Sequence, residues 1–240
     1  KLLYAKGGNL MALGLALTAP IAVSTTGAIT GFTFNSDGVN LVQNINLSGG
    51  RLYICFMGYY HDYLGNEPVA GSLYNQIETT FGENSTAARR PVLIYNGVTY
   101  NADSSGPYDD RIIQNTNLGS AAWLDMRGDH TTEGTFGSQS RPNSTVGTIS
   151  RRSSARGGVF TNIGRSYYSF DLSGSTPVAS PAVAKFQMYV DNRGSLHPHN
   201  QVIIVQSTEL DTTGSATLGF GNCFVADTAA DNATFFGANF

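Results

Sequence analysis

The stretch "RSYYSFDLSG" (residues 165–174) is followed, after a short gap, by "AVAKFQMYV" (residues 182–190), and this pair decides the fold class. In both stretches apolar side chains occupy every second position and polar residues lie between them. Successive side chains of a strand point to opposite faces, so each stretch predicts a strand with one buried face. The predicted inward-facing residues are Tyr168, Phe170, Leu172, Ala184, Phe186 and Met188. The pair therefore predicts two strands of one sandwich sheet. The connection is too long for a two-residue hairpin and is expected to pass between sheets.

The same period of two recurs along the chain in segments bounded by Gly, Asn, Ser and Pro, whereas helical spacing is hard to find. Strands are predicted at residues 10–17, 28–34, 39–47, 51–60, 92–95, 98–101, 110–114, 121–126, 146–150, 158–162, 166–172, 183–190, 201–207, 216–220 and 222–226. A single short helix is predicted at residues 73–79. The sequence thus predicts an all-β protein built as an antiparallel, jelly-roll-like β-sandwich.

Two local signals refine this prediction. Asn96-Gly97 in "YNGVTY" lies between apolar and aromatic residues and predicts a type I′ hairpin turn, because both residues tolerate positive φ. The nearly continuous apolar run in residues 48–60, "SGGRLYICFMGYY", predicts a central strand with both faces covered.

The 240 residues are compatible with two domain arrangements. In the first, an apolar N-terminal strand or assembly segment (residues 1–24) precedes a sandwich at 25–126, a polar linker at 127–145 and a second sandwich at 146–240. In the second, one larger sandwich carries insertions. The strand spacing does not choose between them.

Charged residues make up only 13% of the chain, and the formal net charge is −3. Ordinary soluble domains carry about one quarter charged residues. A surface of uncharged polar groups is typical of extracellular or particle-borne β-proteins, and the small net charge argues against nucleic-acid binding. No uninterrupted apolar span is long enough for a transmembrane helix, so no membrane insertion is expected. Cys55 and Cys223 are interpreted as two buried thiols, with a disulfide as the alternative.

A family resemblance follows from Arg165–Ser173, Ala182–Val190 and Val202–Gln206. These segments resemble the pattern R-x-ϕ-ϕ-x-F-D-L-S, I-x-x-A-x-ϕ-x-ϕ-Y-V and ϕ-x-V, with ϕ apolar, of the DNRLRE-type carbohydrate-binding β-sandwiches. Similar domains occur in bacteriophage virion proteins, and the likeness covers roughly residues 147–226. The first half is similar to another sandwich type of phage structural and bacterial surface proteins through Ile45, Leu47, Gly49, Arg51, Leu52, Asn96, Gly97 and Val98. Together the resemblances imply a non-enzymatic sandwich on the outside of a particle or cell.

Candidate binding residues lie in or near two polar segments, 61–91 and 127–145. Aromatic rings can stack on sugar faces, and the candidates for such contacts with surface glycans are Tyr59, Tyr60, Tyr63 and Trp123. The alternative is that some of these tyrosines belong to the core at the end of a strand.

Metal binding and catalysis have weaker signals. Asp125, Asp129 and Glu133 could supply oxygens to a structural calcium ion, although their spacing matches no EF-hand loop, and no other cofactor is expected. His197 and His199 are interpreted as a pair of loop residues, because a zinc site needs further ligands. No motif of a nucleophile elbow, zinc protease or P-loop occurs, so a non-enzymatic protein is predicted.

The sequence thus favours a structural or attachment protein of a virion, such as a phage tail, fibre or capsid-surface component. Its expected partners are copies of itself in a symmetric oligomer and other virion proteins, at the virion surface or in the extracellular space. Apolar residues near both ends are the predicted assembly contacts: Leu10, Leu13, Leu15, Leu17, Phe235 and Phe236. The alternatives are an extracellular carbohydrate-binding module and a subunit of a cellular extracellular filament in which residues 9–23 donate a strand.

Overall fold

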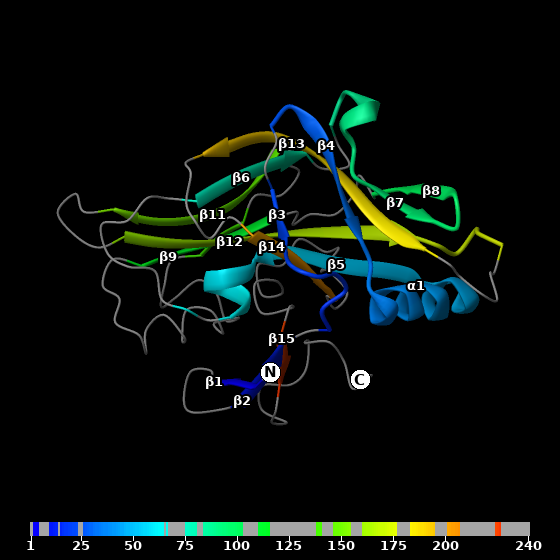
Figure 1. Ribbon diagram of the computed structural model, residues 1–240, viewed down its shortest axis with the longest axis horizontal. Helices are drawn as coiled ribbons and strands as arrows, with labels where there is room; N and C mark the ends of the chain where they lie inside the picture. The colour runs from blue at the N-terminus through cyan, green and yellow to red at the C-terminus, as the bar shows by residue number, and fades with distance from the viewer. Residues whose placement is uncertain are drawn as a thin grey trace.

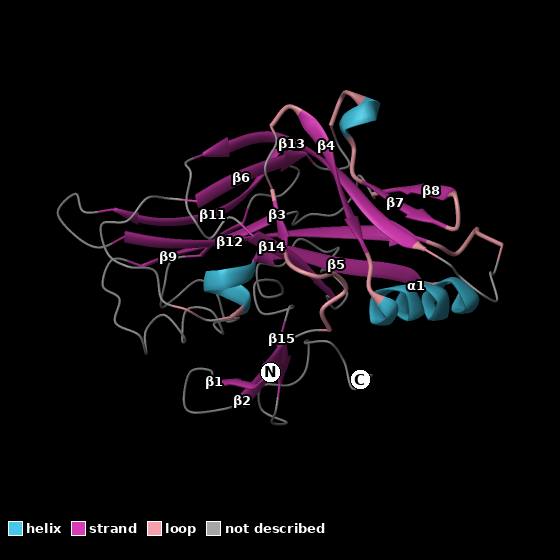
Figure 2. Ribbon diagram, viewed as in Figure 1, coloured by secondary structure: helices cyan, strands magenta, loops and turns pink. Residues whose placement is uncertain are grey.

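The computed structural model consists mainly of strands in two antiparallel sheets, with few helices (Figure 2). It describes residues 2–4, 10–13, 15–23, 26–64, 66, 75–80, 84–102, 110–115, 138–140, 146–154, 160–176, 183–194, 201–206 and 224–226. The predicted all-β class is confirmed.

Three strands form a small sheet: β1 (Leu2–Tyr4), β2 (Leu10–Leu13) and β15 (Phe224–Ala226). Twelve strands form the main sheet: β3 (Ile21–Ala22), β4 (Ala28–Thr33), β5 (Arg51–Gly58), β6 (Asn75–Thr80), β7 (Val92–Tyr95), β8 (Val98–Asn101), β9 (Asp110–Asn115), β10 (Ser138–Ser140), β11 (Val146–Ser154), β12 (Phe160–Asp171), β13 (Ala184–Gly194) and β14 (Gln201–Gln206). Among the described residues, the helical elements are α1 (Ser36–Ser48), a π-helical turn η2 (Tyr59–Tyr63) and a 3₁₀ turn η3 (Ala87–Arg89).

The main sheet folds over on itself to enclose the core (Figure 1). Its order runs β3-β14-β5-β12-β11-β6-β13-β7-β8, so β12 and β13 are separated by two strands within the sheet. Their side chains nevertheless meet, because the Phe186 ring of β13 lies 5.1 Å from the Tyr168 ring and 6.0 Å from the Phe170 ring of β12. The two strands therefore face each other across the core.

The centre of the core is an aromatic cluster around Phe186. Besides the two rings of β12, Phe186 contacts Phe32 on β4 at 5.9 Å, and Phe32 contacts Phe56 on β5 at 5.5 Å. All of the predicted inward-facing residues of the opening pair are buried, whereas Ser169, Asp171, Lys185 and Gln187 are half-buried or exposed. The faces predicted from the period of two are confirmed.

Two further predictions are confirmed. β5 pairs with β12 on one side and β14 on the other, and its consecutive residues Ile54–Met57 are all buried, so it is a central strand covered on both faces. Tyr95 pairs with Val98 around a two-residue turn in which Asn96 has φ 48° and Gly97 has φ 81°, as a type I′ hairpin requires.

Residues 39–47 were predicted as a strand, and this prediction is wrong because they form most of helix α1. Gly38, Val42 and Asn46 are its buried residues, at a spacing of four. The Asn35 side chain caps the first turn by accepting a hydrogen bond from the Gly38 N–H at 2.8 Å. Gly49 ends the helix in the left-handed region, with φ 66°. The apolar residues Val39, Leu41, Val42, Ile45 and Leu47 fit either period in so short a segment, and the capping residues decide for the helix.

The helix predicted at residues 73–79 is also wrong, since β6 occupies Asn75–Thr80 and pairs with both β11 and β13. Long-range pairing and the β-branched residues Ile77, Thr79 and Thr80 favour the strand. The strands predicted at 158–162 and 166–172 are one long strand, β12. The strands predicted at 121–126 and 216–220 lie outside the described residues.

Strands from residues 25–126 and 146–240 are interleaved within the main sheet and share one core cluster. β5 pairs with β12 and β14, and β13 lies between β4 and β7. The small sheet lies beside this body and joins segments near both chain ends (Figure 1). Cys55 is buried in β5, as expected, and Cys223 lies outside the described residues.

Candidate functional site

The candidate site is the turn η2, which carries three of the four predicted glycan-contacting aromatics. It begins directly after β5 and packs against β14. The Leu64 N–H donates to the Tyr59 carbonyl at 2.9 Å, which closes an i→i+5 turn. Single π-helical turns are rare and occur frequently at functional sites.

The turn brings Tyr59 and Tyr63 together. Their rings are stacked, with centroids 5.7 Å apart and an angle of 21° between the planes, and both side chains are half-buried. Burial, and secondarily the neighbouring Tyr59, raises the pKa of the Tyr63 hydroxyl above its usual value. The hydroxyl is therefore protonated at neutral pH and can both donate and accept hydrogen bonds.

Buried polar residues hold the turn in shape. His61 and Asp62 are 5% and 4% exposed. The Nδ1 of His61 lies 2.6 Å from the Asn66 carbonyl oxygen, and because a carbonyl only accepts, Nδ1 carries the proton. The side-chain amide of Asn66 donates back to the Tyr60 carbonyl at 3.0 Å, and the Tyr60 ring meets the His61 ring edge-on at 4.7 Å. These contacts fix the backbone that presents the tyrosines.

The arrangement is suited to binding through ring faces and hydroxyl groups. A half-exposed pair of parallel tyrosines offers an apolar platform with polar tips, which is the chemistry that recognises sugar rings. Within the described part of the chain, no group of three or more His, Cys, Asp or Glu residues is placed to hold a metal ion. No helix in that part is long and apolar enough to cross a membrane.

The other predicted site residues are not gathered at this turn. Leu10 and Leu13 lie in β2 of the small sheet, and Leu15 is half-buried against the core. Leu17 is fully buried in the chain's own core, so its assignment as an assembly contact is corrected. Outside the described residues lie Trp123, Asp125, Asp129, Glu133, His197, His199, Phe235 and Phe236.

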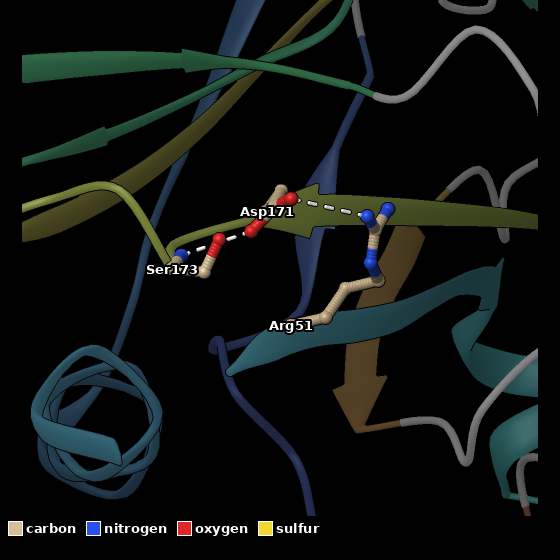
Figure 3. A network of polar contacts seen from close by, with 3 residues as sticks. All are labelled: Arg51, Asp171 and Ser173. Atoms are coloured by element: carbon tan, nitrogen blue, oxygen red, sulfur yellow. Dashed lines mark hydrogen bonds and ion pairs between the residues drawn. The ribbon is translucent and has the colours of Figure 1, made fainter. Parts of the chain in front are cut away.

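Two polar contacts were not anticipated from the sequence. The guanidinium of Arg89 lies over the Tyr189 ring at 4.5 Å and 3.7 Å from Asp191. At the start of β5, Arg51 is 3.2 Å from Asp171 of β12 (Figure 3). The second contact could be expected only from the register of β5 and β12, in which Arg51 and Asp171 lie directly opposite each other.

The Asp171 carboxylate also anchors the turn that follows β12. Its Oδ1 accepts a hydrogen bond from the Ser173 N–H at 2.9 Å, and Figure 3 shows Ser173 and Arg51 on opposite sides of the carboxylate. Hydrogen bonds from the Ser173 side chain and backbone, and to a lesser extent the charge of Arg51, lower the pKa of Asp171. Because both side chains are largely exposed, solvent screening keeps the contribution of this ion pair to stability small.

Comparison of the chain with protein-family models, curated proteins and solved structures gave no match. The resemblance to DNRLRE-type sandwiches therefore stays a prediction from the sequence.

Proposed function

We propose that this chain is a non-enzymatic structural protein on the outside of a virion, such as a phage tail, fibre or capsid-surface component, and that it assembles as a symmetric oligomer. The all-β body and the low content of charged residues, 13%, support this proposal. Turn-linked antiparallel strands with an uncharged polar surface suit a protein that acts by packing against copies of itself and against other virion proteins.

The small sheet is the observation that carries the proposal. β2 lies in its middle, and among the described residues β1 and β15 each pair with β2 alone. Among the described residues, the outer edges of β1 and β15 thus have backbone N–H and C=O groups with no ladder partner, and such groups can pair with a strand of another molecule. Leu10 and Leu13, two predicted assembly residues, lie in its central strand.

The boundary between the small sheet and the core guides the experiment. The Leu15 carbonyl accepts a hydrogen bond from the Gln206 N–H at 2.8 Å, and Leu17 and Val23 are fully buried. Residues 15–23 thus belong to the folded body, whereas residues 1–13 contribute β1 and β2 to the small sheet.

Light scattering over a concentration series tests the proposal with the full chain and a variant lacking residues 1–13. We expect the full chain to form a defined oligomer, and the truncated variant to keep its circular dichroism spectrum but assemble more weakly. Leu17→Ala, which should lower stability while leaving the small sheet intact, is the control for general destabilisation. A full chain that stays monomeric at every concentration would refute the assembly function.

A second candidate, glycan binding, is favoured by the stacked Tyr59 and Tyr63. A glycan array probed with the purified chain tests it, and Tyr60→Ala and Tyr63→Ala should abolish any signal. Tyr189→Ala, which removes a half-buried tyrosine on β13, is the matched control and should leave binding unchanged. An array without signal would eliminate this candidate.

A further inference from the structure

Strand β8 forms one edge of the main sheet, in the hairpin with β7 at one end of the molecule (Figure 1). Its register is Tyr95 to Val98, Ile94 to Thr99, Leu93 to Tyr100 and Val92 to Asn101. The type I′ turn fixes this register, and the buried Leu93 and Tyr95 anchor the hairpin to the core. The edge is therefore held in a defined position.

The direction of the backbone groups of β8 follows from one hydrogen bond. The Ala102 N–H donates to the Pro91 carbonyl at 2.9 Å, so these two residues form a hydrogen-bonded pair. Such pairs alternate with non-hydrogen-bonded pairs along an antiparallel ladder. Val98 and Tyr100 therefore bond to β7, whereas the N–H and C=O groups of Thr99 and Asn101 point away from it. Among the described residues, no backbone partner pairs with these outward groups.

The edge lacks charged side chains and proline, two of the features by which proteins prevent edge strands from pairing. Residues 92–102, "VLIYNGVTYNA", contain no charged residue and no proline. Thr99 and Asn101 are exposed, and Val98 is 50% exposed. A charged strand would repel a copy of itself, whereas an uncharged strand meets its own copy without repulsion. We therefore take a second copy of this chain as the molecule that pairs with the β8 edge.

We propose that β8 pairs antiparallel with β8 of a second copy around a two-fold axis, so that the main sheet continues across the dimer. Thr99 of each copy then pairs with the partner's Asn101, which gives four backbone hydrogen bonds. Tyr100 faces the partner's Tyr100 on the axis, as a close non-hydrogen-bonded pair. Val98 faces the partner's Ala102 and loses its exposure. This interface rests on the proposed assembly function and adds to it a specific isologous contact.

Thr99→Pro tests the interface, because it removes the outward N–H at a position where an edge strand tolerates proline. Each copy loses one N–H, so two of the four hydrogen bonds between the copies are lost. We therefore expect the dimer dissociation constant to rise by about tenfold or more in sedimentation equilibrium. Thr33→Pro on β4 is the matched control. The Thr33 N–H also points away from the paired strand β13, because the neighbouring Phe34 N–H donates to the Ala184 carbonyl at 2.9 Å.

Cross-linking provides an independent test. Tyr100→Cys places two thiols at the axis, where oxidation should join the copies into a covalent dimer. Val98→Cys faces a different residue of the partner and should not cross-link. An oligomer that persists in Thr99→Pro and gives no Tyr100→Cys dimer would overturn the β8 interface while leaving the assembly function standing. A full chain that is monomeric throughout would overturn both.

Discussion

The hydrogen bond between Thr79 of β6 and Tyr168 of β12 gives the sharpest test of the core. The two hydroxyl oxygens lie 2.8 Å apart, and the residues are 0% and 3% exposed. Tyr168→Phe keeps the ring that packs against Phe186 but leaves the Thr79 hydroxyl buried after this bond is lost. Leaving a buried polar group unsatisfied costs about 1–3 kcal/mol, so the free energy of unfolding should fall by this amount.

Tyr95 provides the matched control for the same chemical change. Its side chain is fully buried, and its hydroxyl makes no hydrogen bond to any described residue. Tyr95→Phe therefore removes a buried polar atom without breaking a bond, and stability should stay the same or rise by up to about 1 kcal/mol. Identical substitutions at the two tyrosines should thus have opposite or clearly different effects.

A double-mutant cycle with Thr79→Val isolates the interaction. Either single variant leaves one hydroxyl buried after the bond is lost, whereas the double variant replaces both partners with apolar groups of similar shape. The double variant should therefore be less destabilised than the sum of the two single variants, by about 0.5–3 kcal/mol.

Urea denaturation followed by fluorescence and circular dichroism measures these differences, provided that the two probes give one transition. In a chain of this size, each kcal/mol should also shift the Tm by about 2–4 °C. The reasoning fails if Tyr168→Phe is no more destabilising than Tyr95→Phe, or if the double variant equals the sum of the single variants.

Three further outcomes follow from the structure. Phe186→Ala removes the ring at the centre of the aromatic cluster and should lower stability by about 3–5 kcal/mol in the same urea assay. Asn35→Ala removes the cap of α1 and should cost about 0.5–2 kcal/mol, whereas Leu47→Ala, exposed on the same helix, should stay within about 0.5 kcal/mol. Because the pKa of Asp171 is lowered in the fold, its carboxylate stabilises the folded state above the unfolded pKa of about 4, and this contribution is lost as the pH falls through the folded pKa. Asp171→Asn should therefore show a slightly smaller loss of Tm between about pH 5 and 3 than the unchanged chain, and an identical pH profile would contradict the role given to Ser173.

Side-chain alternation and turn chemistry made much of the fold predictable. The faces of Tyr168, Phe170 and Phe186 follow from the period of two alone. The Asn96-Gly97 turn was equally clear, because few residues tolerate its backbone angles. Such signals depend on neighbouring residues only.

The two wrong predictions concern short segments in which the apolar pattern is ambiguous. In α1, the decisive signals were the Asn35 cap and the left-handed Gly49 at its ends, and the apolar residues between them fitted a strand equally well. In β6, pairing with β11 and β13 outweighed the local pattern. The partners of β6 lie far away in the sequence, so no local reading could include them.

The candidate site was predictable in composition but not in geometry. The sequence places Tyr59, Tyr60 and Tyr63 next to one another, and aromatic chemistry makes them binding candidates. Their stacking depends on the π-helical turn, which in turn depends on contacts of His61 with Asn66. The position of Arg89 over Tyr189 joins residues 100 positions apart, and nothing in either segment indicates it.

The sequence by itself determined which residues can form strands and which face of each strand is buried, because alternation acts within a few residues. Only the tertiary structure decided the pairing order, since each strand could satisfy its backbone groups with many partners and the choice depends on how all apolar faces are buried together. Thus β12 and β13, adjacent along the chain, do not pair but face each other across the core through Phe186. The same global arrangement places β8 at the end of the strand order, where, among the described residues, it pairs with β7 alone.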